Sequence, residues 1–279
     1  MKKILLVLSL AAAGVLTTQA QVLLSGGLTY SQNFNALSNA PSGTTYTWTD
    51  NATPGLEGWY ASRAYTGGTA TAYGPYAYTS YRVGDGGANN GWIWSFGVTG
   101  DADRALGSIS SGTPKTNAFG VWIQNDTGSA VGSILISYVG EQWRNGGNTA
   151  AQTLAFSYET FTGSFGGLLD VVPAGVGGWV GFSSLDFVSP VTGSTATALD
   201  GNNAANQVNF SSVLLTGVSL NPGDGIFLRW LDIDDSGNDH GFGVDNFSIS
   251  FTAVPEPSTM AICGSLALLG LLLHRRNRK

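Results

Sequence analysis

The sequence predicts an all-β protein, a single jelly-roll-like β-sandwich, and three observations support this. Glycine contributes 40 of the 279 residues and charged residues only 11%, about twice and under half of their usual shares. Short aromatic and β-branched runs alternate with Gly, Asn and Ser clusters, the pattern of strands and turns. Lys and Glu, which favour surface helices, are scarce, and residues 21–253 show no convincing helix.

Nine to twelve strands are expected, and the apolar runs locate most of them. The clearest runs are 28–37, 92–98, 118–124, 134–139, 153–158, 179–188, 208–218, 226–233 and 242–251. The Tyr-rich stretch 65–81 predicts either a surface loop or poorly packed strands. Residues 140–144 are expected to connect two core strands, and Trp230 alternates with Leu228, so it should face the core. Turn-punctuated strands in this number are typical of a jelly roll.

The N-terminus has the features of a secretory signal peptide. Lys2 and Lys3 precede an apolar run over 4–16, which is followed by the small-residue site Thr18-Gln19-Ala20. Cleavage is expected between Ala20 and Gln21, so residues 1–20 would be removed and 21–253 would form the exported domain.

The last 26 residues form a second targeting segment. It consists of the motif Val254, Pro255, Glu256, Pro257 and Ser258, an uncharged stretch over 259–273, and a basic tail over 274–279 with Arg275, Arg276, Arg278 and Lys279. The two prolines end the preceding domain. As a transmembrane helix, 259–273 would span roughly 22 Å, short of a hydrocarbon core of about 30 Å. The basic residues would stay cytoplasmic.

This tail resembles the PEP-CTERM sorting signal of Gram-negative bacteria, with its three parts in the same order. The resemblance implies an exosortase as partner, passage through the inner membrane, removal of the tail, and delivery to the cell surface or extracellular matrix. The alternative is a plain C-terminal membrane anchor.

The body of the chain is similar to other PEP-CTERM ectodomains in four blocks: 103–108, 140–144, 198–202 and 237–241. Their layout also resembles a MAM or laminin-G (concanavalin-type) jelly roll. The resemblance implies that Asn33-Phe34 and the block 244–247 lie on terminal strands that meet. It is a likeness of fold and assigns no activity.

The charge and the cysteine count exclude several classes. Residues 21–253 hold 6 of the 12 basic and 17 of the 18 acidic residues, a net charge of −11. Nucleic acid, which needs a basic face, is therefore not an expected partner. The one cysteine, Cys263, lies in the hydrophobic tail, so the exported domain has no disulfide. This balance is compatible with a neutral polysaccharide, or with metal-bridged contact to an acidic polymer.

An acidic loop is the candidate metal site. Its carboxylates are Asp232, Asp234, Asp235, Asp239 and Asp245. Ca²⁺ takes about six to eight oxygen ligands from such closely spaced side chains. The order Asp232, Asp234, Ser236 and Gly237 matches the first half of an EF-hand loop, but the twelfth position is Gly243 rather than Glu. The alternative is a solvated turn.

Three residues are candidate glycan contacts: Trp143, Arg144 and Tyr76. Trp143 could stack on a sugar, whereas the alternative is a buried Trp beside a Glu141–Arg144 ion pair. Tyr76 belongs to the Tyr-rich stretch, whose alternative is a solvated loop.

Catalysis finds little support in the sequence. His240 is the single histidine of the exported domain, and no Gly-x-Ser-x-Gly motif is present. No carboxylate pair stands out for glycoside hydrolysis. The sequence therefore predicts a non-catalytic, polysaccharide-associated module, with a structural or adhesive matrix protein and a glycan-active hydrolase as alternatives.

Overall fold

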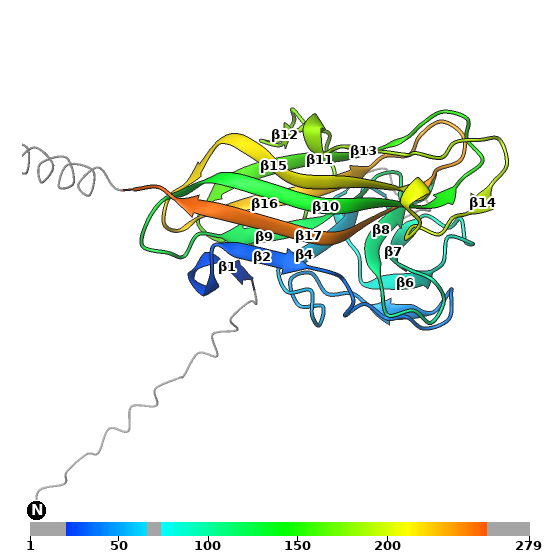
Figure 1. Cartoon of the computed structure of the whole chain (residues 1–279), viewed down its shortest axis with the longest axis horizontal. Coiled ribbons are helices and arrows are strands. Elements are labelled where there is room, and N and C mark those ends of the chain that lie inside the picture. Colours follow the sequence, from blue (N-terminus) through cyan, green and yellow to red (C-terminus); the bar gives the residue numbers. More distant parts are fainter. Residues whose placement is uncertain (1–20, 66–73, 256–279) are drawn as a thin grey trace, which may run out of the picture.

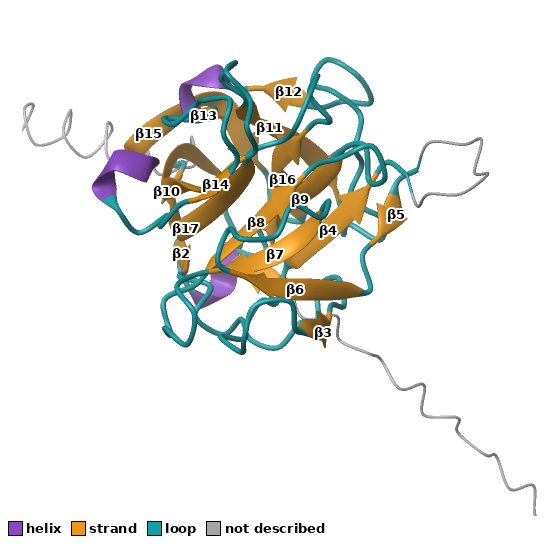
Figure 2. Ribbon diagram, turned by 90° about the vertical axis from the view of Figure 1, so that its right-hand side faces the viewer, coloured by secondary structure: helices purple, strands orange, loops and turns teal. Residues whose placement is uncertain are grey.

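A computed structural model describes residues 21–65 and 74–255, and it shows an all-β fold of two packed sheets. Figure 1 shows the long strands running along the main axis, and Figure 2 looks along them onto one end of the sandwich. The predicted β-sandwich is confirmed. No helix in these two ranges is long and apolar enough to cross a membrane.

The first sheet has eight strands, in the order β12-β11-β16-β9-β4-β5 with β1 beside β9 and β13 beside β11. Its strands are β1 (Val22–Leu23), β4 (Trp59–Arg63), β5 (Tyr76–Ala77), β9 (Asn117–Gln124), β11 (Thr153–Thr162), β12 (Val180–Gly181), β13 (Phe187–Val188) and β16 (Asp224–Asp232).

The second sheet has nine strands, in the order β14-β10-β17-β8-β7-β6-β3 with β15 beside β10 and β2 beside β17. Its strands are β2 (Thr29–Gln32), β3 (Thr45–Thr47), β6 (Ser80–Gly84), β7 (Trp92–Phe96), β8 (Ala105–Ile109), β10 (Val131–Asn145), β14 (Thr197–Ala198), β15 (Gln207–Leu220) and β17 (Gly241–Ala253). Three short 3-10 turns complete the set: η1 (Leu24–Gly26), η2 (Ser183–Leu185) and η3 (Ala204–Asn206).

The first and last long segments of the fold lie side by side. β2 pairs antiparallel with β17, and Gln32 lies opposite Phe247. The terminal strands therefore meet, as expected, but Asn33 and Phe34 follow β2 and do not lie on it. Because β17 has 13 residues, it separates Gly241 from Ala253 by roughly 40 Å at about 3.3 Å per residue.

The main core fills the space between the sheets and centres on Trp230. Its ring stacks on Trp59 at 6.0 Å and meets Phe247 of the opposite sheet edge-on at 5.6 Å. Trp230 is fully buried, as its alternation with Leu228 predicts. A second cluster, on the outer side of the first sheet, includes Trp122 and Phe227.

β10 corrects one prediction, because residues 140–144 continue the strand and do not connect two strands. The first half of β10 alternates buried and exposed positions, whereas every residue from Gly140 to Asn145 is buried. Trp143 there packs in a third cluster with Phe96 and Trp94. Burial on both faces removes the alternation, which is why sequence periodicity missed this half.

The described residues form 17 strands, eight in one sheet and nine in the other, more than the nine to twelve expected. Seven of them lie outside the apolar runs named above: β1, β3, β4, β5, β6, β8 and β14. β8 (Ala105–Ile109) follows a turn at 99–100 and is buried throughout. In the Tyr-rich stretch, Tyr78 and Tyr81 are buried core residues, so this part is not a solvated loop.

Candidate functional site

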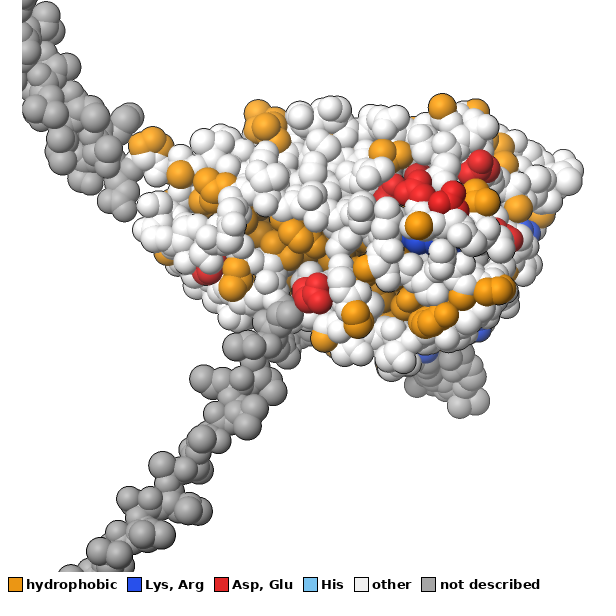
Figure 3. All heavy atoms as spheres, turned by 60° about the horizontal axis from the view of Figure 1, so that its bottom comes forward, with side chains coloured by type: hydrophobic (Ala, Val, Ile, Leu, Met, Phe, Trp, Pro, Cys, Tyr) orange, Lys and Arg blue, Asp and Glu red, His pale blue; other side chains and the backbone are white. Residues whose placement is uncertain are grey.

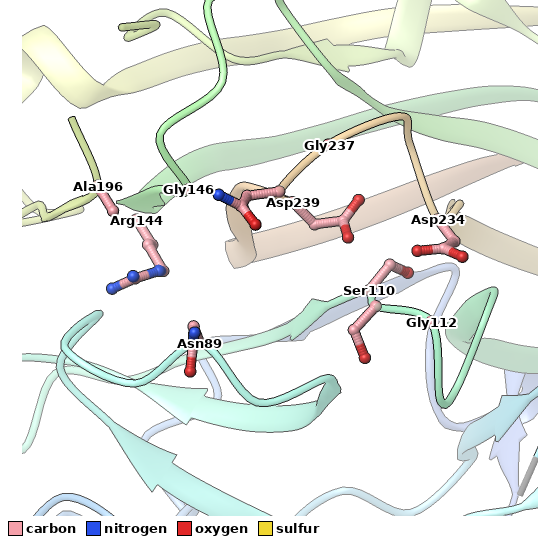
Figure 4. A pocket seen from close by; sticks show the side chains of 11 residues that line it. Asn89, Ser110, Gly112, Arg144, Gly146, Ala196, Asp234, Gly237 and Asp239 are labelled. Carbon is pink, nitrogen blue, oxygen red and sulfur yellow. The ribbon is translucent and has the colours of Figure 1, made fainter. Parts of the chain in front are cut away.

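A polar pocket lies at one end of the sandwich, where β8, β10 and β16 finish. Its volume is about 300 Å³. The lining residues are Asn89, Ser110, Ser111, Gly112, Arg144, Gly146, Ala196, Asp234, Gly237, Asn238 and Asp239. Because β17 begins at Gly241 beside this pocket and ends at Ala253, the chain leaves the domain at the far end. Figure 4 shows Arg144 and Asn89 at one end of the pocket and Ser110 and Asp234 at the other.

A second hollow of about 340 Å³ adjoins the pocket through Asn89 and Ser111. Its other lining residues are Arg82, Asn90, Gly91, Trp92 and Thr113. The guanidinium carbons of Arg63 and Arg82 both lie 4.7 Å from the centroid of the Trp92 ring. The π-system of Trp92 is therefore already engaged by cations.

Side chains of the 145–152 loop hold the 233–240 loop in place over the pocket. Nδ2 of Asn148 donates to the carbonyl of Ser236 at 2.9 Å, and Nε2 of Gln152 donates to that of Asn238 at 3.0 Å. Gln152 also accepts from the backbone N–H of His240 at 2.6 Å. Gly237 adopts a φ of 97°, which glycine tolerates without steric cost. These contacts fix the pocket's rim.

His240 is a structural residue in this arrangement. It is fully buried, and its Nδ1 accepts a hydrogen bond of 2.9 Å from the backbone N–H of Gly146. Burial lowers the pKa of His240, so the ring is neutral at physiological pH with its proton on Nε2. It does not line the pocket.

Asp232 lies inside the fold rather than on the loop surface. Its Oδ2 accepts a hydrogen bond of 2.6 Å from Oγ of Ser108, and its backbone carbonyl accepts one of 2.7 Å from Oγ of Ser110. Burial raises the pKa of Asp232 to about 8. A buried carboxyl that is protonated at neutral pH is a poor ligand for a hard cation.

Two of the predicted carboxylates do line the pocket: Asp234 and Asp239. Oδ2 of Asp234 forms an ion pair of 3.0 Å with Nζ of Lys115. Asp239 accepts a 2.9 Å hydrogen bond from the backbone N–H of Asp235. Burial raises the pKa of Asp239 to about 7, with added repulsion from Asp234 and Asp235. The pocket thus combines one paired carboxylate with one that titrates near neutrality.

Asp245 lies elsewhere, on β17 near Glu141 of β10. Burial raises the pKa of Asp245 to about 7, and burial together with the charge of Asp245 raises that of Glu141 to about 8. Oδ2 of Asp245 accepts from Asn246 at 2.8 Å, while its buried Oδ1 has no partner among the described residues.

Asp235 lies between Asp234 and Asp239 on the 233–240 loop, with its backbone N–H bonded to Asp239, and does not line the pocket. The five carboxylates thus do not converge on one point, which corrects the expectation of a single cation loop. In the two described ranges, no three His, Cys, Asp or Glu side chains come together in a way that could hold a metal ion. The match to half of an EF-hand loop fails because β16 carries Asp232 into the interior while β17 carries Asp245 to another part of the second sheet.

Trp143 is 1% exposed, and this corrects the expectation that it stacks on a sugar. Its Nε1 donates a 2.9 Å hydrogen bond to Oε2 of Glu141, and its ring stacks on Phe96 at 6.0 Å. Oε1 of Glu141 accepts from Gln207. The buried-tryptophan alternative agrees with the structure, but the expected Glu141–Arg144 ion pair does not form.

Arg144 follows Trp143 in β10 and reaches the pocket. Its Nη1 donates to the carbonyls of Gly86 and Gly87, each at 3.0 Å. Its Nε is buried and has no partner among residues 21–65 and 74–255. Of the three glycan-contact candidates, Arg144 alone lines this pocket. Tyr76 lies half-buried in β5, at the edge of the other sheet.

The targeting residues fall mostly outside the described part of the chain. Gln21 is described, and its Nε2 donates to Gln124 at 2.6 Å. Val254 is exposed, and its N–H bonds to the carbonyl of Ala130. Residues 1–20 with Ala20, and residues 256–279 with Glu256, Pro257, Ser258 and the basic tail, lie outside it.

Several pocket residues had no signal in the sequence. Asn89, Ser110 and Ser111 stand in ordinary Gly/Ser/Asn turns, and Lys115 is an isolated basic residue after one of them. Only the topology, which brings the β6–β7, β8–β9 and β16–β17 connections to the same end, shows that they converge.

Comparison with known proteins gives little. No protein-family model matches the chain, and no curated protein matches it. A solved structure of an arabinose-bound GH51 α-L-arabinofuranosidase aligns with 83% of this chain and 29% of its own, at 12% identity and a TM-score of 0.30. A likeness this distant carries no argument about fold or activity.

Proposed function

We propose that this is an exported, non-catalytic module that binds extracellular polysaccharide at the polar pocket. The observation that carries the proposal is the pocket itself, where hydroxyl, amide, guanidinium and carboxylate groups converge in about 300 Å³. Such a concentration of donors and acceptors suits a ligand rich in hydroxyl groups. The side chains of Asn89 and Asn238 make no hydrogen bonds with other described residues, so they are available to a ligand.

The proposed route to the cell surface rests on the sequence. A signal peptide over 1–20 and a PEP-CTERM-like tail over 254–279 would direct export, with an exosortase acting at the inner membrane of a Gram-negative bacterium. The pocket lies at the opposite end of the sandwich from Val254. A tail attached to membrane or surface would therefore leave the pocket pointing outward.

The finer fold type is part of the same proposal. We propose a jelly-roll sandwich of the laminin-G or concanavalin type, because neighbours in each sheet are mostly non-consecutive strands. The face drawn in Figure 3 carries several acidic side chains and few basic ones, in keeping with the net negative charge and with the exclusion of nucleic acid as a partner.

The proposal is tested by co-sedimentation of the full chain with the exopolysaccharide of its host. At pH 6, where Asp239 is mostly protonated, we expect saturable retention that is lost in Asp239→Ala, which removes both carboxyl oxygens from the pocket. Retention should be kept in Asp126→Ala, a control carboxylate in the β9–β10 turn at the other end of the sandwich. Runs in calcium and in chelator test the acidic loop as a candidate for Ca²⁺. Absence of retention in both buffers would overturn the proposal.

A second candidate function, a structural or adhesive matrix protein, is favoured by β15. Within the part of the chain that the structure describes, this 14-residue strand pairs only with β10, and it carries no charged residue. Unprotected edges of this kind pair with other strands. Sedimentation velocity that shows concentration-dependent association in the absence of polysaccharide would support it.

A third candidate, a glycan-active hydrolase, is favoured by the two carboxylates of the pocket. Glycoside hydrolysis uses one carboxyl with a raised pKa and one ionised carboxylate. The pKa of Asp239 is raised to about 7, whereas Asp234 is paired with Lys115. Release of reducing ends from the host polysaccharide, abolished in Asp239→Asn, would establish it.

A further inference from the structure

Arg144 is a buried cation without a counter-ion. It is 9% exposed, and burial is the one cause that lowers its pKa. No carboxylate in the described ranges forms an ion pair with it. A buried guanidinium stays charged, so its charge is costly unless an anion compensates it.

The other two buried arginines show what compensation looks like in this fold. Arg104 donates from Nε, Nη1 and Nη2 to Ser95, Val98 and Gly84, and the charges of Asp101, Asp103 and Asp85 act on it. Arg229 packs over Trp179 at 3.7 Å and is influenced by Asp170 and Glu159.

Among the described residues, Arg144 has neither a carboxylate whose charge acts on it nor an aromatic ring packed against it. Its two hydrogen bonds both leave from Nη1, which accounts for one edge of the guanidinium. Nε and Nη2 make no hydrogen bond with the described residues. The group lies against the polar pocket, beside the free amide of Asn89 (Figure 4).

We infer that Arg144 binds an anionic group, a carboxylate or a sulfate, on a sugar unit held in the polar pocket. The inference rests on the proposed function and names its ligand class as acidic polysaccharide. Guanidinium groups form strong charge-assisted hydrogen bonds with such oxyanions. The anion would accept from Nη2 of Arg144 and from the amide of Asn89.

The pocket's own carboxylates lie away from the Arg144 end. Asp234 lies at the other end and is neutralised by Lys115 at 3.0 Å. In the close-up view, the carboxylate of Asp239 points toward Ser110 and away from Arg144 (Figure 4). Sugar hydroxyls can therefore donate to the acidic end while the anion occupies the basic end.

The test uses affinity electrophoresis of the full chain through gels that contain matched polymers. The pairs are polygalacturonate with its fully methyl-esterified form, and dextran sulfate with dextran. We expect retardation in an anionic polymer and not in its neutral counterpart, and the pair that responds identifies carboxylate or sulfate. Free galacturonate or sulfated glucose, and not galactose or glucose, should release the protein.

Variants connect the retardation to Arg144. Arg144→Gln should raise Kd at least tenfold, whereas Arg144→Lys, which keeps the charge, should lose less. Arg63→Gln removes the same charge outside the pocket and should change Kd less than twofold. Melting temperatures show whether each variant folds, and the release by free acidic sugar tests the inference on the unmodified protein.

The outcomes separate the inference from the proposed function. Equal retardation by neutral and anionic polymers, or unchanged binding in a folded Arg144→Gln, would overturn the inference that Arg144 binds an anionic group. The proposed polysaccharide-binding function would remain. Retardation by the anionic polymers that Arg63→Gln weakens equally would indicate non-specific charge attraction and would also overturn the inference. No retardation in any gel would overturn both.

Discussion

The backbone N–H of Gly146 donates a 2.9 Å hydrogen bond to Nδ1 of His240, although the two residues are 94 positions apart. This bond joins the loop after β10 to the loop before β17. Both loops line the polar pocket, through Gly146 on one side and Asp239 on the other. The rim of the pocket is therefore held by a buried, neutral histidine.

The first prediction concerns this histidine. His240→Leu should lower the free energy of unfolding by about 1–3 kcal/mol, because it leaves the N–H of Gly146 buried without an acceptor. His240→Asn should lose less, since its Oδ1 stands near the position of Nδ1. Urea unfolding of the full chain measures both. Equal losses in the two variants would contradict the hydrogen-bonding role.

The second prediction concerns buried carboxyls. The pKa values of Asp232 and Glu141 are raised to about 8 and that of Asp245 to about 7. Between about pH 4 and pH 8 the unfolded chain releases these protons while the folded chain keeps them. Stability is therefore highest below pH 4 for these groups and falls as pH rises, by up to about 1.4 kcal/mol per unit for each group.

Asp232→Asn isolates one of these contributions. The amide resembles the protonated carboxyl in shape and cannot ionise, so the variant should match the parent near pH 4 and become more stable than it near pH 8. Chemical denaturation across this pH range provides the comparison. Parallel pH profiles for the two proteins would show that Asp232 does not titrate as described.

How much the sequence could predict depends on whether a strand is buried on one face or two. Alternation located the outer half of β10, where Leu135 is exposed between buried isoleucines. Alternation missed residues 140–145, which are buried on both faces. Trp143 packs on Phe96 in a cluster separate from the main core, and its neighbours in β10 are buried as well. The pattern of apolar residues along one strand does not show which other segments cover its second face.

The site was less accessible to sequence reasoning for a related reason. The spacing of Asp232, Asp234 and Asp239 suggested one cation loop, but strand and turn geometry sends Asp232 inward to Ser108 and leaves Asp239 in the pocket. Asn89 and Lys115 join them from distant turns. Convergence of connections at one end of a sandwich is set by topology, which no single segment encodes.

The third prediction tests the burial of Trp143 through a glycine. A Cβ added at Gly201 would overlap the indole ring of Trp143, whereas one added at Gly128 meets nothing within 4 Å. Gly201→Ala should therefore destabilise the fold by about 1–3 kcal/mol through overpacking, and Gly128→Ala should be nearly neutral. Thermal unfolding of both variants decides it. A neutral Gly201→Ala would place Trp143 outside a packed core.

The fourth prediction concerns calcium. Because the described carboxylates do not form a group of three that could hold a metal ion, Ca²⁺ in the millimolar range should shift the melting temperature by less than about 1 °C relative to chelator. A bound ion present at 100 times its Kd would add about 2.7 kcal/mol. A large calcium-dependent shift would show that the 233–240 loop rearranges around a cation.

The last prediction links pocket charge to ligand binding. Burial and the charges of Asp234 and Asp235 raise the pKa of Asp239 to about 7. Other ionisable groups also lie on or beside this loop. Asp234 forms an ion pair with Lys115, Arg144 stays charged, and His240 is neutral because burial lowers its pKa. Burial and the charge of Asp234 raise the pKa of Asp235. Asp232, beneath the loop, has a pKa raised to about 8.

As pH rises through 7, Asp239 gains a negative charge inside the pocket and should repel an anionic sugar. The Kd for acidic polysaccharide is thus expected to rise several-fold from pH 6 to pH 8. In Asp239→Asn, Kd should change less between pH 6 and pH 8, and the change that remains should come from Asp232. Adding Asp232→Asn to this variant should remove the remaining pH dependence of Kd. Affinity electrophoresis at the two pH values measures each variant. Binding that strengthens toward pH 8 would mean that ionised Asp239 accepts hydrogen bonds from the ligand, and that its charge does not act on the anion at Arg144.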